Sequence, residues 1–264
     1  MIDNKTIVLT GASSGIGLEV LKLLAKGTGN RILAVSRHAE ERLWDFPSNV
    51  TAFNSDIGTK EGVDAVFKKA EELFGKIDIY YNNAGFPYYE VYDNENWDRL
   101  QRIFDTNTLA PAYTYVKYLH HLNGRPGHLA YTISAIGKMA MPGYALYSAS
   151  KFGLQGFQEG IRLEMPKNMK LTCLYPVATD TNFFKVAADG VSFEKPFPVQ
   201  NPVTVAKQMV RGIEKGRKSV SPCFLFAVGR VLMTIFPFVR SIYWWLEQKK
   251  LERFVRKTRG TELF

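Results

Sequence analysis

Tyr147 and Lys151 stand four residues apart in the run Tyr-Ser-Ala-Ser-Lys, a spacing that places both side chains on one face of a helix. A phenol is a weak acid, with an unperturbed pKa of about 10. A neighbouring ammonium group stabilises the phenolate and lowers that pKa toward the operating pH, as general acid–base catalysis requires. The same pair alone is also typical of a solvated helix face, so its meaning depends on the rest of the sequence.

A glycine-rich loop near the N-terminus gives this pair a context. Residues 5–10 form a short, apolar and β-branched run that is typical of a buried parallel strand. Residues 11–17 then read Gly-Ala-Ser-Ser-Gly-Ile-Gly, and leucines and valines at helical spacing follow. This order favours a dinucleotide site, because glycines permit a sharp turn and the helix N-terminus presents free N–H groups to a pyrophosphate. A turn that binds nothing is the alternative.

The remaining sequence alternates between strand and helix patterns. This alternation predicts βαβ units and a parallel sheet. The sequence contains no repeat and no dividing linker, and 264 residues suit one α/β domain. Strand-like runs lie at 6–10, 31–36, 50–53, 77–81, 128–134 and 170–175, and helix-like stretches at 16–26, 60–74, 95–122, 144–165 and 202–215.

Four ordered motifs resemble the short-chain dehydrogenase/reductase family in its single-domain form of about 250 residues. They are Thr-Gly-Ala-Ser-Ser-Gly-Ile-Gly at 10–17, Asn-Asn-Ala-Gly at 82–85, Ser134, and the run from Tyr147 to Lys151. The resemblance covers about residues 3–220. It implies an α/β fold, a Rossmann-like doubly wound parallel sheet with helices on both faces, and hydride transfer between nicotinamide and a carbonyl or secondary alcohol.

The resemblance also implies a set of catalytic residues. Tyr147 would protonate the carbonyl oxygen as hydride arrives, or act as the base in the reverse direction. Lys151 would lower the tyrosine pKa and bind the nicotinamide ribose, and Ser134 would orient the substrate oxygen. Asn107 matches the position that holds a water linking Lys151 to solvent; a polar residue that bends a helix is the alternative.

Further positions match cofactor contacts of the family. Asp56 matches an acidic residue that touches the adenine ring, and a helix N-cap is its alternative role. Val177 stands where the family commonly has glycine after the sixth strand, and a branched side chain disfavours a positive φ there. The implied cofactor contacts are Gly11, Ser13, Ser14, Gly15, Ile16, Gly17, Ser36, Arg37, Asp56, Ile57, Asn83, Ala84, Gly85, Tyr147, Lys151, Pro176 and Thr181.

The end of the second predicted strand favours NADP(H) over NAD(H). NAD enzymes of this kind hold the adenine ribose with an acidic residue about 20 positions past the glycines. Counting from Gly17 reaches Arg37, and no carboxylate occurs between Asn30 and Ala39. A guanidinium suits a 2′-phosphate through bidentate contacts, and Ser36 adds a hydroxyl. The alternative is an arginine that ends the strand in solvent.

The segment after Thr181 forms a lid over the substrate in the family. Here residues 182–199 carry several aromatic side chains and only scattered charges, which favours an apolar carbonyl or alcohol substrate. Tyr88 and Tyr89 are expected to add to this wall. The same aromatic residues are equally typical of core contacts.

The net charge of +9 belongs entirely to the C-terminal part of the chain. Residues 201–264 contain 13 Lys and Arg against 4 Asp and Glu, whereas both counts are 21 in residues 1–200. The apolar stretch from Phe224 to Phe236 is shorter than the roughly 20 residues of a spanning helix. Apolar residues followed by a basic cluster are typical of an interfacial anchor on anionic lipid. Packing on a second subunit and a seventh strand near 219–226 are the alternatives.

These observations predict two regions. Residues 1–220 form a dinucleotide-binding and catalytic domain, and residues 221–264 form a basic, apolar extension that packs on the same domain, a partner subunit or a membrane surface. We expect a homodimer or homotetramer, as is common in the family. Because the N-terminus enters a strand almost at once, it leaves no room for a signal peptide. We therefore expect a cytoplasmic protein, with peripheral membrane contact as an open alternative.

Other function classes fit the sequence less well. Nucleic-acid binding is disfavoured, because the basic residues lie among large apolar side chains without a recognised module. The four histidines and two cysteines lack metal-ligand spacing, so no metal is expected. A cofactor-binding regulator without enzymatic activity is the rival interpretation, and the intact set of Ser134, Tyr147 and Lys151 argues against it. A membrane-associated scaffold built around the basic tail is a third interpretation.

Overall fold

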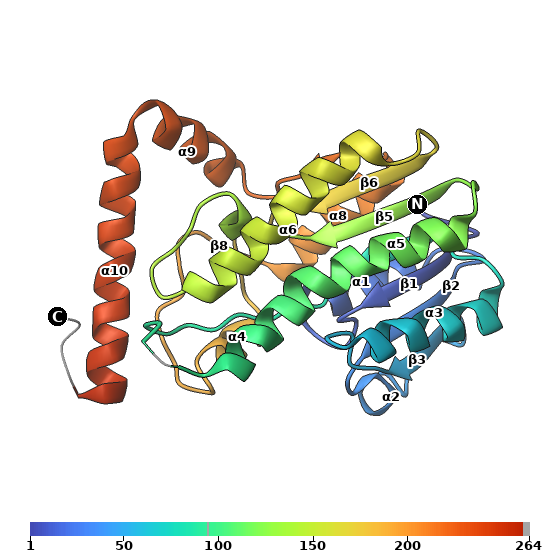
Figure 1. Ribbon diagram of the computed structural model, residues 1–264, viewed down its shortest axis with the longest axis horizontal. Helices are drawn as coiled ribbons and strands as arrows, with labels where there is room; N and C mark the ends of the chain where they lie inside the picture. The colour runs from blue at the N-terminus through green and yellow to red at the C-terminus, as the bar shows by residue number, and fades with distance from the viewer. Residues whose placement is uncertain (94, 261–264) are drawn as a thin grey trace.

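A seven-stranded parallel sheet forms the centre of the computed structural model, which describes residues 1–93 and 95–260 (Figure 1). The strand order β3-β2-β1-β4-β5-β6-β9 reverses between β1 and β4, so this is the doubly wound sheet predicted from the sequence. A small second sheet pairs β7 (Ala178–Thr179) with β8 (Val199–Gln200). The main strands are β1 (Thr6–Thr10), β2 (Arg31–Ser36), β3 (Val50–Asn54), β4 (Ile79–Asn82), β5 (Gly127–Thr132), β6 (Met169–Leu174) and β9 (Ser219–Val220).

Helices cover both faces of the main sheet (Figure 1). Side chains alternate along each strand, so Val8 and Leu33 enter the core under α3, α5 and α6, while Ile7 and Ile32 enter the core under α1 and α8. The helices are α1 (Gly15–Leu24), α2 (Ala39–Arg42), α3 (Lys60–Phe74), α4 (Trp97–Phe104), the π-helical turn η1 (Asp105–Leu109), α5 (Ala110–Leu122), the 3₁₀ turn η2 (Ala135–Gly137), α6 (Ala145–Glu164), α7 (Phe183–Ala187), α8 (Pro202–Glu214), α9 (Phe224–Ile235) and α10 (Pro237–Arg259).

The predicted strands and helices before residue 216 are confirmed to within two residues at their ends. The helix predicted at 95–122 differs inside, because the π-helical turn η1 separates α4 from α5. The seventh strand predicted near 219–226 is only two residues long. Pro222 has no N–H for a strand ladder, and the Cys223 sulfur then accepts the Phe226 N–H at 3.4 Å, which caps α9.

The C-terminal extension forms two helices that meet at an elbow, which we define as residues 224–246. Figure 1 shows α9 and α10 at one edge of the molecule, joined far from the sheet. Helix α9 has no buried residue, whereas α10 buries Glu247, Leu251 and Val255 in its second half. Within residues 1–93 and 95–260, no helix is long and apolar enough to cross a membrane. Residues 261–264 of the predicted extension lie outside the described residues.

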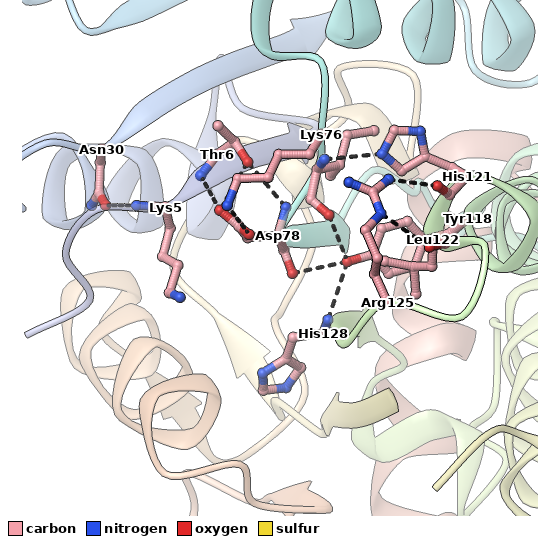
Figure 2. A network of polar contacts seen from close by, with 11 residues as sticks. Lys5, Thr6, Asn30, Lys76, Asp78, Tyr118, His121, Leu122, Arg125 and His128 are labelled. Carbon is pink, nitrogen blue, oxygen red and sulfur yellow. Dashed lines mark hydrogen bonds and ion pairs between the residues drawn. The ribbon is translucent and has the colours of Figure 1, made fainter. Parts of the chain in front are cut away.

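A polar network joins the strands at the edge opposite their carboxyl ends (Figure 2). Asp78, just before β4, accepts the Thr6 backbone N–H and the Thr6 hydroxyl, both at 2.9 Å. The Tyr118 hydroxyl of α5 donates to Asp78 O at 2.8 Å and accepts the His128 N–H at 3.1 Å. This network therefore fixes β1, β4 and β5 relative to one helix.

His128 is a buried, neutral member of this edge. The Thr172 hydroxyl donates to Arg217 O at 2.7 Å, so it accepts from His128 Nε2, which lies 2.8 Å away. The proton of the neutral imidazole is therefore on Nε2. Burial, with a smaller contribution from the Lys170 ammonium, lowers the pKa of His128 to about 4.

The buried histidine predicts a loss of stability in mild acid. In the unfolded chain, His128 binds a proton below the ordinary histidine pKa of about 6.5. In the folded chain, its imidazole stays neutral down to about pH 4. The free energy of unfolding is therefore not reduced by His128 above pH 6.5, and it falls as the pH is lowered from 6.5 toward 4. Between pH of about 7.5 and about 5, we expect the native chain to lose about 2 kcal/mol of unfolding free energy more than His128→Gln. Urea unfolding at both pH values measures this difference, and identical losses would contradict it.

Candidate active site

A cavity of about 660 Å³ follows the carboxyl ends of the strands. Its lining runs from Arg37 and Asp56, after β2 and β3, past Ser134 and Tyr147, to helix α9. Ligands of open α/β sheets bind outside these strand ends, where the strand order reverses. The cavity therefore joins the glycine loop to the tyrosine predicted to act in catalysis.

The glycine loop has the geometry that a bound pyrophosphate requires. Gly11 and Gly15 have φ values of 65° and 55°, a region that side chains disfavour. A Cβ on Gly17 would lie 2.1 Å from Gly11 O and 2.5 Å from Asn83 Nδ2. Ser14, at the N-cap of α1, makes no side-chain hydrogen bond to the first turn, whose N–H groups can therefore bind an anion. Of the predicted loop residues, all but Gly17 line the cavity.

The Asn-Asn-Ala-Gly turn braces the glycine loop. The Thr10 hydroxyl accepts the backbone N–H groups of Asn83 and Ala84, both at 3.1 Å. The Asn83 amide donates in turn to Thr10 O at 3.1 Å and to Gly11 O at 3.3 Å. Asn83, Ala84 and Gly85 line the cavity, as predicted for cofactor contacts. The turn thereby ties the end of β4 to the end of β1.

The end of β2 presents basic groups to the cavity. Ser36 and Arg37 both line it, and Arg37 is exposed and makes no ion pair within the described ranges. Arg42 of α2 lines the same end, although the sequence did not single it out. Glu40, also in α2, faces Asn54, whose amide lies 3.4 Å from the carboxylate, and does not line the cavity. Two guanidinium groups therefore stand at this end.

Asp56 and Ile57 line the cavity beyond β3. Thr59, not Asp56, caps α3, because the Thr59 hydroxyl accepts a first-turn N–H at 3.0 Å. The alternative role of Asp56 as a helix N-cap is therefore wrong. The Asp56 carboxylate pairs with Arg102 at 3.2 Å, and among the described residues it is the only acidic group that lines the cavity.

Ser134, Tyr147 and Lys151 come together from the end of β5 and the first turns of α6. Lys151 Nζ lies 5.8 Å from the centre of the Tyr147 ring and donates to Thr132 O at 3.0 Å. Ser134 has a φ of 109°, and its hydroxyl donates to Pro176 O at 3.3 Å. A hydrogen bond links the side chains of Ser134 and Tyr147. Lys151 is buried and does not itself line the cavity.

Burial dominates the titration of this group. It raises the pKa of Tyr147, and the hydrogen bond with Ser134 opposes this shift. It also lowers the pKa of Lys151 to about 7. The net shift of the Tyr147 pKa is upward, and the lowering expected from Lys151 stays a prediction. A lysine that is only partly charged at neutral pH stabilises a phenolate weakly.

Asn107 lies fully buried in the π-helical turn η1. Its amide nitrogen donates to Phe86 O at 2.9 Å and to Ser150 Oγ at 3.1 Å, and its oxygen accepts the Phe86 N–H at 3.1 Å. The side chain therefore links the segment after β4 to α6. A π-helical turn inside a helix often marks a functional site. The water contact implied for Asn107 remains a prediction.

The turn after β6 closes against the glycine loop. Pro176 and Thr181 line the cavity, and Thr181 Cγ2 lies 3.3 Å from the position that a Cβ on Gly15 would occupy. Val177 also lines the cavity, and its φ is not positive. The branched side chain therefore creates no backbone strain, and the departure from the family pattern leaves the turn intact.

Apolar side chains from residues 182–199 and from the tail line the end of the cavity beyond Tyr147, together with Arg230. Phe183 of α7 stands edge-on to Tyr147, with ring centres 5.6 Å apart. Phe226 and Met233 of α9 and Tyr243 of α10 complete this end. The sequence showed that this stretch is apolar. It did not show that α9 turns toward the active site, because that depends on where β9 ends.

Tyr88 and Tyr89 do not line the cavity, contrary to expectation. Tyr89 is buried against Phe193, with ring centres 4.1 Å apart, and the Arg99 guanidinium lies 3.5 Å from the centre of the Tyr88 ring. Both residues therefore support the lid from its core side. Phe86 lines the cavity instead.

Comparison with known proteins places the chain among oxidoreductases. Residues 5–191 match the family model described as short chain dehydrogenase. The uncharacterized oxidoreductase YxnA of Bacillus subtilis is 30% identical over 193 residues, which cover 69% of this chain but only 54% of YxnA, about half its length. The putative oxidoreductase SadH of Mycobacterium tuberculosis is 28% identical over 239 residues, covering 83% of this chain and 86% of SadH. The 3-ketodihydrosphingosine reductase of Dictyostelium discoideum is 28% identical over 245 residues, covering 81% and 73%.

Solved structures share the fold. A short chain dehydrogenase/reductase from Burkholderia phymatum in complex with NAD has a TM-score of 0.77 at 18% identity, covering 91% of this chain and 97% of that one. A short chain dehydrogenase from Burkholderia cenocepacia in complex with NADP has a TM-score of 0.76 at 20% identity, covering 89% and 94%. Because the family match spans most of the chain, this protein belongs to the short-chain dehydrogenase/reductase family and is an oxidoreductase.

Proposed function

We propose that the chain is an NADP(H)-dependent oxidoreductase that transfers hydride between nicotinamide and an apolar ketone, aldehyde or secondary alcohol. The observation that carries this proposal is the single cavity, which runs from the basic end at Arg37, past the glycine loop, to Ser134 and Tyr147. The enclosed Gly17 and the first-turn N–H groups of α1 fit a dinucleotide pyrophosphate. A bound nicotinamide supplies the hydride chemistry there.

The residues around Tyr147 would control the proton. In reduction, the carbonyl carbon gains hydride and the carbonyl oxygen gains the proton of the Tyr147 hydroxyl. Ser134, whose side chain is hydrogen-bonded to Tyr147, would orient that oxygen. Lys151, whose pKa is lowered to about 7, can both hold and release a proton near neutral pH and would restore the tyrosine. Asn107 fixes the neighbouring backbone at Phe86 and is proposed to lead a water toward Lys151.

The basic end of the cavity supports NADP(H) over NAD(H). Arg37 and Arg42 line it, and no carboxylate from β2 or α2 faces it in the described structure. A 2′-phosphate gains charge-assisted hydrogen bonds from a guanidinium, whereas a 2′-hydroxyl is held better by a carboxylate. The two structural neighbours carry NAD and NADP respectively, so they do not decide between the cofactors.

The substrate end supports an apolar substrate. Phe183, Phe226 and Met233 face the cavity there, and hydrophobic walls with few polar groups suit an apolar ligand. The relative from Dictyostelium discoideum is named as a reductase of 3-ketodihydrosphingosine, which is consistent with a carbonyl on an apolar chain.

We further propose a cytoplasmic homodimer or homotetramer that contacts a membrane surface through its tail. Helices α5 and α6 expose apolar side chains that suit a subunit interface. Val116 on α5 is 43% exposed, and Phe152 and Leu163 on α6 are 44% and 90% exposed. The membrane contact is supported by the exposed apolar residues of the elbow.

Replacing Tyr147 with phenylalanine tests the catalytic proposal. The variant keeps the ring but loses the proton donor, so we expect kcat for NADPH-dependent reduction to fall by roughly 100-fold or more, while NADPH affinity stays the same. Apolar ketones and aldehydes would be assayed by NADPH oxidation, with binding measured separately. Tyr89→Phe is the matched control, because Tyr89 is a buried tyrosine that does not line the cavity. Turnover in Tyr147→Phe equal to that of the control would refute the role of Tyr147.

Replacing Arg37 with aspartate tests the cofactor proposal. We expect the affinity for NADPH to fall by roughly 10- to 100-fold, because a hydrogen-bonded ion pair with the 2′-phosphate is lost and a repulsive charge replaces it. NADH affinity should rise or stay constant. Titration of both cofactors against the native chain and the variant measures this. Equal affinity of the native chain for NADPH and NADH, or an unchanged preference in the variant, would show that Arg37 does not select the cofactor.

A further inference from the structure

The elbow has a large exposed apolar surface that the other described residues leave uncovered. None of the side chains of α9 is buried, and the first half of α10 continues the exposed apolar surface. A water-soluble helix normally hides one apolar face. The most exposed of these side chains are Phe224 at 82%, Ile235 and Phe238 at 62%, Trp245 at 57% and Ile242 at 55%.

The charges of the tail are separated from this surface. Within the elbow, the only charged residues are Arg230 and Arg240, and none is acidic. The basic cluster that follows is largely ion-paired within the molecule, either inside α10 or to residues of other segments. The pairs are Lys249 with Glu252, Lys250 with Glu247, Arg253 with Glu194, and Arg259 with Asp93. The sequence interpretation combined the apolar residues and this basic cluster in one anchor, and the exposed apolar part of that anchor is the elbow.

The same helix forms part of the cavity wall. Leu225, Phe226 and Met233 of α9 line the cavity, while Val231 and Ile235 are 53% and 62% exposed. One helix therefore separates the substrate end of the cavity from the exposed apolar surface. Whatever covers that surface also lies against a helix that forms the wall of the cavity.

We propose that the elbow inserts into one leaflet of a phospholipid bilayer and that the cavity takes its substrate, a membrane-resident lipid carbonyl, from that leaflet. The substrate part rests on the proposed function; the insertion does not. A bilayer suits this surface because exposed apolar side chains occur on α9, on α10 and where the two helices join. A deformable apolar phase can cover a surface of that shape. Arg240 of α10 complements anionic headgroups, whereas Arg230 of α9 lines the cavity. A second copy of the chain already has another candidate surface on α5 and α6.

Vesicle binding of the full chain with NADP⁺ bound tests the insertion. We expect binding to phosphatidylcholine vesicles, strengthened by added phosphatidylglycerol and largely kept at high salt, because apolar burial is not screened. Brominated acyl chains should quench Trp245. Ile235→Glu combined with Phe238→Glu should weaken partitioning at least about tenfold, since both side chains would have to leave water.

A matched control keeps this result specific. Trp44→Glu combined with Trp97→Glu introduces the same charges at side chains that are 82% and 70% exposed outside the elbow, and it should bind vesicles like the native chain. Binding only to anionic vesicles that is lost at high salt would overturn insertion. A chain that ignores vesicles and forms an oligomer broken by the elbow variant would show that a second copy covers the surface.

A separate experiment tests whether lipid reaches the cavity wall. Phe226→Trp, made in a chain with Trp245→Phe, places a reporter on the cavity wall. We expect acyl-chain bromines to quench this reporter beyond the Trp245→Phe background if lipid reaches the wall. If the chain binds vesicles but the reporter is not quenched, the insertion of the elbow stands and the entry of lipid into the cavity is refuted. Neither measurement uses turnover, so failure of the proposed reaction, seen in Tyr147→Phe kinetics, stays distinguishable.

Discussion

The hydrogen bonds between Thr10 and the turn at Asn83 hold the site together, because they join the ends of β1 and β4 where the strand order reverses. The same asparagine continues outward: its amide donates to Gly11 O, and its oxygen accepts the Thr132 hydroxyl at 3.0 Å. Thr132 O in turn accepts from Lys151. The glycine loop and the lysine therefore share one framework, and a shift of the Asn83 turn would displace both.

Burial lowers the pKa of one basic side chain at each end of the parallel strands. At the end of the strands drawn in Figure 2, His128 is buried and neutral. Its Nε2–H group donates a hydrogen bond to the Thr172 hydroxyl. At the other end, Lys151 is buried with one carbonyl acceptor, and its pKa falls from 10.5 to about 7. Below its unfolded pKa of 10.5 this lowers the stability of the fold, increasingly so toward pH 7, and the shift corresponds to several kcal/mol. Such a cost is typical of functional sites.

The sequence predicted the features that depend on residues close together in the chain. Tyr147 and Lys151 share one helix, and the glycine loop follows one strand, so their positions could be predicted from spacing alone. The direction of the tyrosine pKa could not, because burial comes from segments distant in the sequence. The contacts of Asn107 with Phe86 and Ser150 are equally non-local. Pro222 was visible in the sequence, but its power to end β9 and start α9 depended on the sheet edge that it meets.

Apolar packing, more than charge, fixes the tail and hence the shape of the cavity. The Arg253–Glu194 pair is 58% exposed on both sides, so salt screens it and it contributes little. Leu251 and Val255 are buried in the lid core, where each contributes about 1.5–3 kcal/mol. The second half of α10 therefore stays attached to the lid when the ion pairs weaken. Because α9 is held through α10, Phe226 keeps its place in the cavity wall whether or not the basic cluster is paired.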